Sequence, residues 1–95
     1  MVLDPDTQAV VRFGQSIPLT PTQYRLLEAL VDAQGAIVDY STLARCTTAH
    51  DEQAGQGRNL IQAHLSALRR RIDDPFGTAS ITAVYGRGYR LTAST

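Results

Sequence analysis

The chain has 95 residues, of which 43% are hydrophobic and 19% charged, and its formal net charge is zero. This length suits one domain with a modest core and excludes a core that also encloses a large active-site cavity. No run approaches the ~18 consecutive apolar residues of a membrane span, so we expect no membrane partner. The first residues, MVLDPDT, lack the features of a signal peptide, and we expect a cytoplasmic protein with one domain over residues 1–95.

The zero net charge conceals a separation of charge along the chain. Residues 1–57 hold seven acids and three arginines, a net charge of −4, whereas residues 58–95 hold six arginines and two acids, a net charge of +4. Because salt screens charges over ~8 Å, a polyanion beside the C-terminal third would meet mainly positive charge. All nine cations are arginine, which fits phosphate recognition and biased codon usage equally well.

The first nineteen residues predict an antiparallel sheet. Short segments of alternating polarity at 2–4, 8–13 and 16–19 are separated by residues typical of turns. Gly14-Gln15 has the glycine-first form of a two-residue hairpin loop, so we expect consecutive strands to pair as a meander.

A helix is expected directly after this sheet. Thr20 is suited to the N-cap, Pro21 to the first helical position, and Gln23 completes a capping box three residues after the cap. The helix should end near residue 33, with Gly35 as a left-handed cap.

A shorter helix is expected from Tyr40 to about Cys46, with Asp39 as its N-cap and Leu43 as its main apolar anchor. The next segment, 47–57, is polar, contains paired acids and glycines, and shows no periodicity. We interpret it as a loop.

Residues 58–72, RNLIQAHLSALRRRI, predict a long amphipathic helix rich in positive charge. Its apolar residues recur at intervals of four, three and four, so they form one stripe that should face a core. The stripe consists of Ile61, Leu65, Leu68 and Ile72. The opposite face carries hydrogen-bond donors and almost no acid, although such a helix taken alone is usually an ordinary solvated surface element. Asp73-Asp74-Pro75 should end the helix, because proline disfavours helix in the residue before it.

The segment 81–91 predicts a two-stranded hairpin with an arginine at its tip. Ile81 to Val84 form one strand, Gly86-Arg87-Gly88 a tight turn, and the chain then returns. The two glycines lack the following helix that a phosphate-binding glycine loop needs.

Tyr24 and Tyr89 are expected in the core rather than at a ligand site. Tyr85 has two open interpretations, since it either packs on the third helix or presents its hydroxyl to phosphate, and packing is slightly favoured.

Cysteine, histidine and acidic residues give no pattern of a catalytic or metal site. Cys46, expected as a small buried residue, lacks metal-ligand spacing with His50 and His64. His50 beside Asp51 and Glu52 lies in a polar loop without a nucleophile. We therefore expect no enzyme, no cofactor and no metal.

Three segments in this order, LTPTQYRLLEAL, HLSALRRRI and ITAVYGRGYRL, resemble the C-terminal DNA-binding domain of OmpR/PhoB-type response regulators, the effectors of bacterial two-component systems. The resemblance runs over residues 2–91. It implies an α+β winged helix-turn-helix fold, with an N-terminal sheet given by the family as a four-strand meander, three helices and a C-terminal β-hairpin wing. The chain shows no receiver domain.

The resemblance implies sequence-specific binding of double-stranded DNA for transcription regulation, with helix 58–72 in the major groove and wing 81–91 at the minor groove. It places Gln62 and Ala67 at base edges, and Arg87 suits a narrow minor groove. It places phosphate contacts at Asn59, His64, Ser66 and Arg69. The full candidate DNA-binding set is Arg58, Asn59, Gln62, His64, Ser66, Ala67, Arg69, Arg70, Tyr85 and Arg87.

This sequence departs from the family pattern at several of these positions. Ala67 and Tyr85 stand where many members carry arginine, and Gln62 replaces the commoner acid. Fewer cationic contacts should make DNA binding weaker and less dependent on salt.

The resemblance also implies partners other than DNA. The loop 47–57 lies where relatives contact RNA polymerase, and family analogy implies head-to-tail dimers on direct repeats. An alternative function keeps the fold as a protein-interaction module with weak or no DNA binding. The neutral net charge, the missing arginines and the acidic loop favour this alternative.

Overall fold

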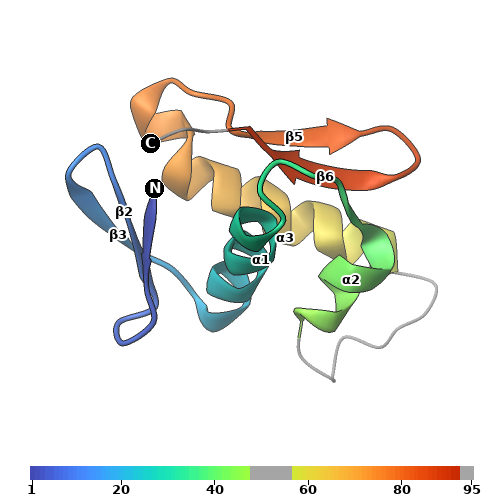
Figure 1. Cartoon of the computed structure of the whole chain (residues 1–95), viewed down its shortest axis with the longest axis horizontal. Coiled ribbons are helices and arrows are strands. Elements are labelled where there is room, and N and C mark those ends of the chain that lie inside the picture. The colour runs from blue at the N-terminus through green and yellow to red at the C-terminus, as the bar shows by residue number, and fades with distance from the viewer. Residues whose placement is uncertain (48–56, 93–95) are drawn as a thin grey trace.

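The computed structural model describes residues 1–47 and 57–92, and all side chains in these ranges except those of 57–59. An N-terminal sheet and a C-terminal sheet lie on either side of three helices (Figure 1). The winged helix-turn-helix class predicted from the sequence is confirmed. No helix in the described ranges has the length and apolar character needed to cross a membrane.

The N-terminal sheet has three described strands, in the order β1-β2-β3, where the family pattern implied four. They are β1 (Val2–Asp4), β2 (Ala9–Arg12) and β3 (Gln15–Pro18), and both pairings are antiparallel. Arg12 pairs with Gln15, so the hairpin loop is Phe13-Gly14 and not the predicted Gly14-Gln15. Both loop residues have positive φ, 51° and 78°, as a type I′ turn requires.

Helix α1 (Pro21–Asp32) begins as predicted. Thr20 Oγ1 accepts from Gln23 N, and Gln23 Oε1 accepts from Thr20 N, both at 3.1 Å. The helix ends as predicted, with Ala33 as the C-cap and a left-handed φ of 91° at Gly35, and Gln34 before it is also left-handed at 52°.

Helix α2 (Tyr40–Arg45) is also confirmed, with the Asp39 side chain accepting from Thr42 N at 2.8 Å. This backbone hydrogen bond lowers the pKa of Asp39. Leu43 is fully buried, as expected for the anchor of this helix.

The C-terminal sheet contains one strand more than the predicted hairpin. Strands β5 (Ile81–Val84) and β6 (Gly88–Leu91) pair as expected, and β4 (Val38–Asp39) adds to the other edge of β6. Gly88 permits this pairing, because a Cβ at this position would lie 2.0 Å from the carbonyl oxygen of Val38. Strand β4 leads directly into α2, so the pairing fixes where α2 begins.

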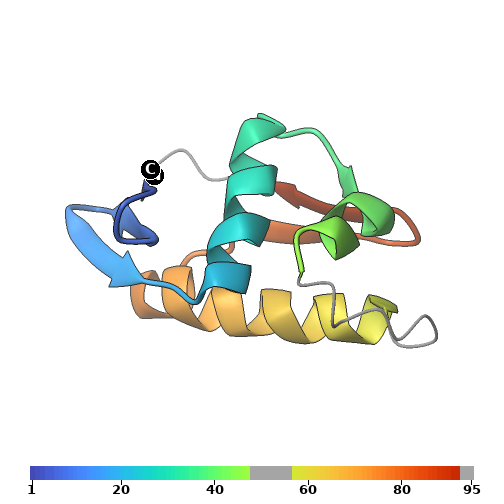
Figure 2. The same ribbon diagram turned by 90° about the horizontal axis from the view of Figure 1, so that it is seen from below.

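Helix α3 (Gly57–Ile72) crosses beneath α1 and α2 and supplies four fully buried residues to a single core (Figure 2). All four belong to the predicted stripe, and Tyr24 and Tyr89 are buried as predicted. The core comprises Val10, Leu26, Leu27, Leu30, Val38, Leu43, Ile61, Leu65, Leu68, Ile72, Ile81, Tyr89 and Leu91.

A buried ion pair joins the N-terminal sheet to the C-terminal end of α3. Arg12 Nη1 donates to Asp73 Oδ1 at 2.6 Å and to the carbonyl oxygen of Ile72, and the two charged side chains are only 2% and 3% exposed. Asp73 also accepts from Thr78 Oγ1 at 2.9 Å and from Ser80 Oγ and N at 2.5 and 3.1 Å. One carboxylate thus holds together β2, the end of α3 and the start of β5.

Two aromatic rings lie beside this pair, one of them from the turn before β3. The Arg12 guanidinium carbon lies 5.0 Å from the ring centroid of Phe13 and 5.8 Å from that of Phe76, which belongs to the 3-10 helix η3 (Asp74–Phe76). The two phenylalanine rings are 5.1 Å apart. These contacts join the turn before β3 to η3.

The Asp73 carboxyl should make stability depend on acid pH. Burial alone would raise its pKa, but hydrogen bonds from Ser80, Arg12 and Thr78 outweigh burial and hold the pKa below its usual value. Its contribution to folding is therefore complete above the unfolded pKa of about 3.9 and is lost as pH falls from there through the folded pKa. We expect the free energy of unfolding, measured by urea titration between neutral and acid pH, to fall less steeply below pH ~4 in Asp73→Asn than in the parent. Equal slopes would contradict this expectation.

Candidate nucleic-acid interface

The outer face of α3 is open to solvent. In Figure 2 this helix runs along one edge of the molecule, with the other elements on one side of it. Opposite the buried stripe, Gln62, Ala63, Ser66 and Arg70 are exposed and Ala67 is half-buried. The structure thus brings together four of the predicted contact residues, namely Gln62, Ser66, Ala67 and Arg70, on one accessible surface.

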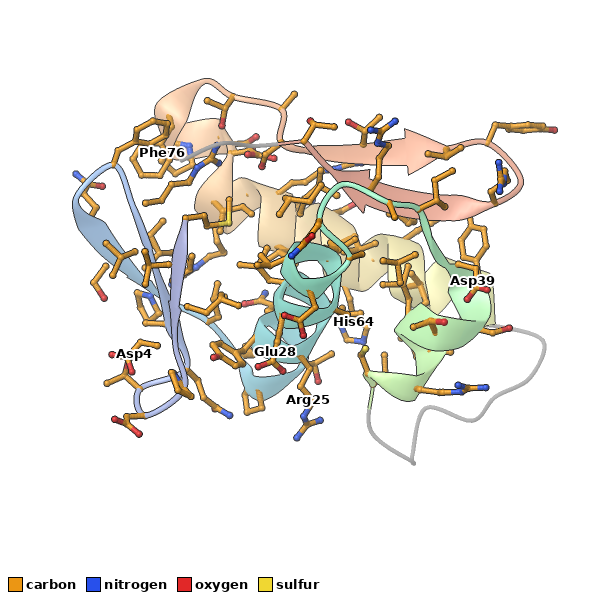
Figure 3. All side chains as sticks on the ribbon, viewed as in Figure 1. Asp4, Arg25, Glu28, Asp39, His64 and Phe76 are labelled. Atoms are coloured by element: carbon orange, nitrogen blue, oxygen red, sulfur yellow. The ribbon has the colours of Figure 1, made fainter. Side chains whose placement is uncertain are left out.

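Arg69 and His64 lie at the sides of this face and not at its exposed centre. Arg69 is half-buried, with its guanidinium carbon 5.7 Å from the ring centroid of Tyr89. His64 is also half-buried, and its side chain lies between α1 and α2 (Figure 3). Arg69 Nε and His64 Nε2 are buried without a hydrogen-bond partner in the described part of the chain. Both residues are less accessible to a phosphate than the exposed set.

The remaining arginine of the basic run is engaged within the domain. Arg71 Nη2 donates to the carbonyl oxygen of Pro18 at 2.5 Å, which ties α3 to the end of β3.

Burial raises the pKa of Tyr89, with a further contribution from Tyr40, while the charge of Arg69 opposes both. Tyr89 therefore stays neutral beneath the Arg69 guanidinium.

Several sequence predictions lie wholly or partly outside the described residues. The side chains of Arg58 and Asn59 are among them, although the backbone of both belongs to α3. The loop predicted over 47–57 falls mostly in the range 48–56, which is also outside them.

The wing turn presents two side chains to solvent. Val84 pairs with Gly88, and Arg87 N donates to the Val84 carbonyl oxygen at 3.0 Å, which closes a three-residue turn over residues 85–87. Arg87 is exposed at the tip as predicted. Tyr85 is fully exposed, at 101%, so the favoured expectation that it packs on α3 is wrong. Gly86 reverses the chain with a left-handed φ of 72°.

A groove of about 400 Å³ separates α3 from the wing. Its lining residues are Tyr40, Gln62, Ala83, Val84, Tyr85, Gly86 and Tyr89. Sequence reasoning missed Tyr40, whose ring meets that of Tyr89 edge-on at 6.1 Å between centroids. The β4–β6 pairing brings these tyrosines together, and the sequence around Tyr40 contains no signal for that pairing.

The described residues do not assemble a metal site. No group of three or more His, Cys, Asp or Glu side chains among them could hold a metal ion. Cys46 is half-buried against the core rather than fully buried, and burial raises the pKa of its thiol. His50, Asp51 and Glu52 lie outside the described residues.

Comparison with known proteins places the chain in a family. Residues 14–91 match the family described as "Transcriptional regulatory protein, C terminal", and the chain belongs to that family. The resemblance to OmpR/PhoB-type response-regulator DNA-binding domains is thereby confirmed.

The relatives are bacterial transcriptional regulatory proteins. The chain is 33% identical over 89 residues to CutR of Streptomyces coelicolor and 36% identical over 90 residues to TcrA of Mycobacterium tuberculosis. Each alignment covers 94% of this chain but only 39% and 34% of the relative, so the chain spans less than two-fifths of these proteins.

Solved structures of response-regulator domains share the whole fold. The AdeR DNA-binding domain, solved in complex with an intercistronic region, matches with a TM-score of 0.80 at 25% identity and covers 98% of this chain and 94% of that one. The DNA-binding domain of Escherichia coli CpxR matches with a TM-score of 0.69 at 29% identity over 94% of this chain and 86% of that one.

Proposed function

We propose that this domain binds double-stranded DNA selectively and thereby regulates transcription in the bacterial cytoplasm, by binding rather than by catalysis. The observation that carries the proposal is the exposed outer face of α3, whose inner face is wholly committed to the core. An α-helix about 10–12 Å in diameter fits a major groove about 12 Å wide. The close fold match to AdeR, a domain solved on DNA, supports the same function.

Residue roles within this proposal follow from accessibility. Gln62 is exposed and its amide can pair with adenine through two hydrogen bonds, whereas the Ala67 methyl suits contact with thymine. Ser66 and Arg70 are exposed on the same face and suit phosphates. Arg58, Asn59, His64 and Arg69 are proposed as phosphate contacts at the ends and flanks of the helix.

Arg87 would complete the interface from the wing. A guanidinium at an exposed hairpin tip suits the negative potential of a narrow minor groove, which attracts it without a base-specific hydrogen bond. We also propose head-to-tail dimers on direct repeats and contact with RNA polymerase through loop 47–57, both on family resemblance.

The test is selection of duplexes from a random pool, followed by fluorescence anisotropy on the selected sequences. We expect an enriched motif, with half-site spacing and stoichiometry that report any dimer. Failure to bind any duplex at micromolar protein and low salt would refute DNA binding and favour a protein-interaction role.

Gln62 and Arg70 should separate base reading from phosphate binding. We expect Gln62→Ala to weaken binding to the selected motif by about 1–3 kcal/mol and to leave binding to unrelated duplexes unchanged. Arg70→Ala should weaken binding to all duplexes alike and lower the salt slope by about one. Arg70 is preferred to Arg69 here because removing Arg69 would also disturb Tyr89. Equal losses on every duplex for both variants would refute this division.

A further inference from the structure

We propose that Asp73 is a positioning residue for DNA recognition: it fixes the wing relative to α3, so that Arg87 can make its contact while α3 lies in the major groove. The inference rests on the proposed function. It assigns a role in binding to a carboxylate that is itself too buried to touch DNA, at 2% exposure. Asp73 acts at the base of the wing, whereas Arg87 lies at its tip.

One side chain joins the end of α3 to the start of the wing. The main packing partners of α3 in the described part of the chain are α1, α2 and η3 rather than the wing strands. Asp73 directly follows α3, and its carboxylate accepts from Ser80 N at 3.1 Å and from Ser80 Oγ at 2.5 Å. Ile81 N, at the start of β5, donates to the same carboxylate at 3.4 Å. The two proposed DNA-contacting elements are thus linked through Asp73.

The two strands of the wing are held in different ways. β6 pairs with β4 beside the wing turn, at Gly88 and Tyr89. β5 is an edge strand in the order β4-β6-β5, so among the described strands it pairs with β6 alone. Thr92 N donates to the Ser80 carbonyl oxygen at 2.8 Å, which closes the base of the hairpin but does not attach it to α3. Asp73 supplies that attachment, and the angle between the hairpin and α3 therefore depends on it.

Arg12 holds the carboxylate in place from the N-terminal sheet. Its Nη1 donates to Asp73 Oδ1 at 2.6 Å and to the carbonyl oxygen of Ile72, so the end of α3 and the base of the wing share one anchor on β2. This anchor lies at the end of the molecule opposite the wing turn (Figure 1). A shift of the base would tilt the hairpin about its pairing with β4 and change the direction in which Arg87 points.

Such a tilt matters because α3 and the wing must meet one duplex at the same time. A binding constellation needs to be held within about 0.5 Å and 10–20° of its productive geometry, by residues that are themselves fixed by hydrogen bonds. A hairpin that is free to tilt leaves this range for part of the time. Arg87 would then contribute less to the affinity and to its dependence on salt.

The test is a mutant cycle with Arg87, in which Arg12→Met and Asp73→Leu together remove the link without leaving a buried charge. Binding to the selected duplex is measured by anisotropy across a salt series, at a temperature where thermal melting shows each variant to be folded. In the parent, Arg87→Ala should weaken binding about fivefold and lower the salt slope by about one. In Arg12→Met/Asp73→Leu both losses should already be present, and adding Arg87→Ala should weaken binding by no more than about twofold further.

Three further variants distinguish positioning from a general structural role. Gln62→Ala should keep its full motif-specific loss in Arg12→Met/Asp73→Leu, because the buried stripe still holds α3. Asp74→Ala, which alters an exposed neighbouring acid, should leave the effect of Arg87→Ala at its parent size. Ser80→Ala removes one hydrogen bond to the wing and keeps the ion pair, so it serves if the double variant does not fold. Arg87→Ala should have a smaller effect in Ser80→Ala than in the parent.

Two results would overturn the inference while DNA binding stood. One is a full effect of Arg87→Ala in every Asp73 or Ser80 variant that folds, which would leave Asp73 with a role in stability alone. The other is parent-like affinity and salt slope in Arg87→Ala itself, because the wing would then make no contact for Asp73 to position. Absence of binding by the parent to any duplex would instead refute the proposed function.

Discussion

Replacing Asp73 by alanine should lower the free energy of unfolding by about 3–5 kcal/mol, as expected for breaking a buried ion pair. The variant would leave the Arg12 guanidinium buried without its carboxylate and would remove the acceptor for Thr78 and Ser80. Urea denaturation followed by circular dichroism measures the loss. A single small domain is expected to unfold in two states, which makes the comparison direct.

Asp74→Ala is the matched control, because this neighbouring acid is exposed and takes no part in the network. It should change stability by no more than about 0.5 kcal/mol. The double variant Arg12→Met with Asp73→Leu should recover much of the loss, since apolar residues of similar size often replace a buried pair without cost. A loss in Asp73→Ala no larger than that in Asp74→Ala would show that the pair does not stabilise the fold.

The same pair bears on the DNA-binding surface. Asp73 follows the last residue of α3, and its acceptor bonds reach Ser80 at the start of the wing. The relative position of the two proposed DNA-contacting elements therefore depends on one carboxylate anchored to the N-terminal sheet.

Local signals in the sequence predicted most of the fold. The capping box at Thr20, the Asp39 cap and the apolar stripe of α3 each involve residues within one or a few turns of one another, so their physics is visible in a short window. The hairpin 81–91 was equally local. All of these elements occur where the sequence placed them.

Features that join distant segments escaped sequence reasoning. Arg12 and Asp73 are 61 residues apart, and in the sequence the first resembles an ordinary strand residue and the second a helix-ending acid. The β4–β6 pairing rests on a two-residue strand. The predicted loop register at Phe13 was wrong, and in the structure the Phe13 ring lies 5.1 Å from that of Phe76, a contact between segments far apart in the sequence.

The sequence predicted which elements form the candidate site but not how exposed each of its side chains is. Periodicity showed which side of α3 faces outward, yet it did not show that His64 and Arg69 are half-buried. For Tyr85 the sequence left two interpretations open, packing on the third helix and a phosphate contact, and packing was slightly favoured. The three-residue turn directs it into solvent instead, and this depends on backbone geometry rather than on residue type.

Leu65→Ala and Ser66→Ala should distinguish the role of the buried face of α3 from that of its exposed face. Leu65 is fully buried near the middle of the helix, and its truncation should cost about 2–5 kcal/mol of unfolding free energy through lost burial and the cavity left behind. The neighbouring Ser66 is exposed, so Ser66→Ala should leave stability nearly unchanged while weakening DNA binding.

If α3 both builds the core and reads DNA, Leu65→Ala should lower stability without changing the DNA contacts, and Ser66→Ala should weaken DNA binding without lowering stability. Binding by Leu65→Ala is measured at a temperature where thermal melting shows the variant to be folded. Its affinity for the selected duplex should then depend on salt as steeply as that of the parent, because no phosphate-facing side chain has changed. A lower slope in Leu65→Ala at full folding would mean that core and interface are coupled through the helix. The exposed residues alone would then not account for the phosphate contacts of α3.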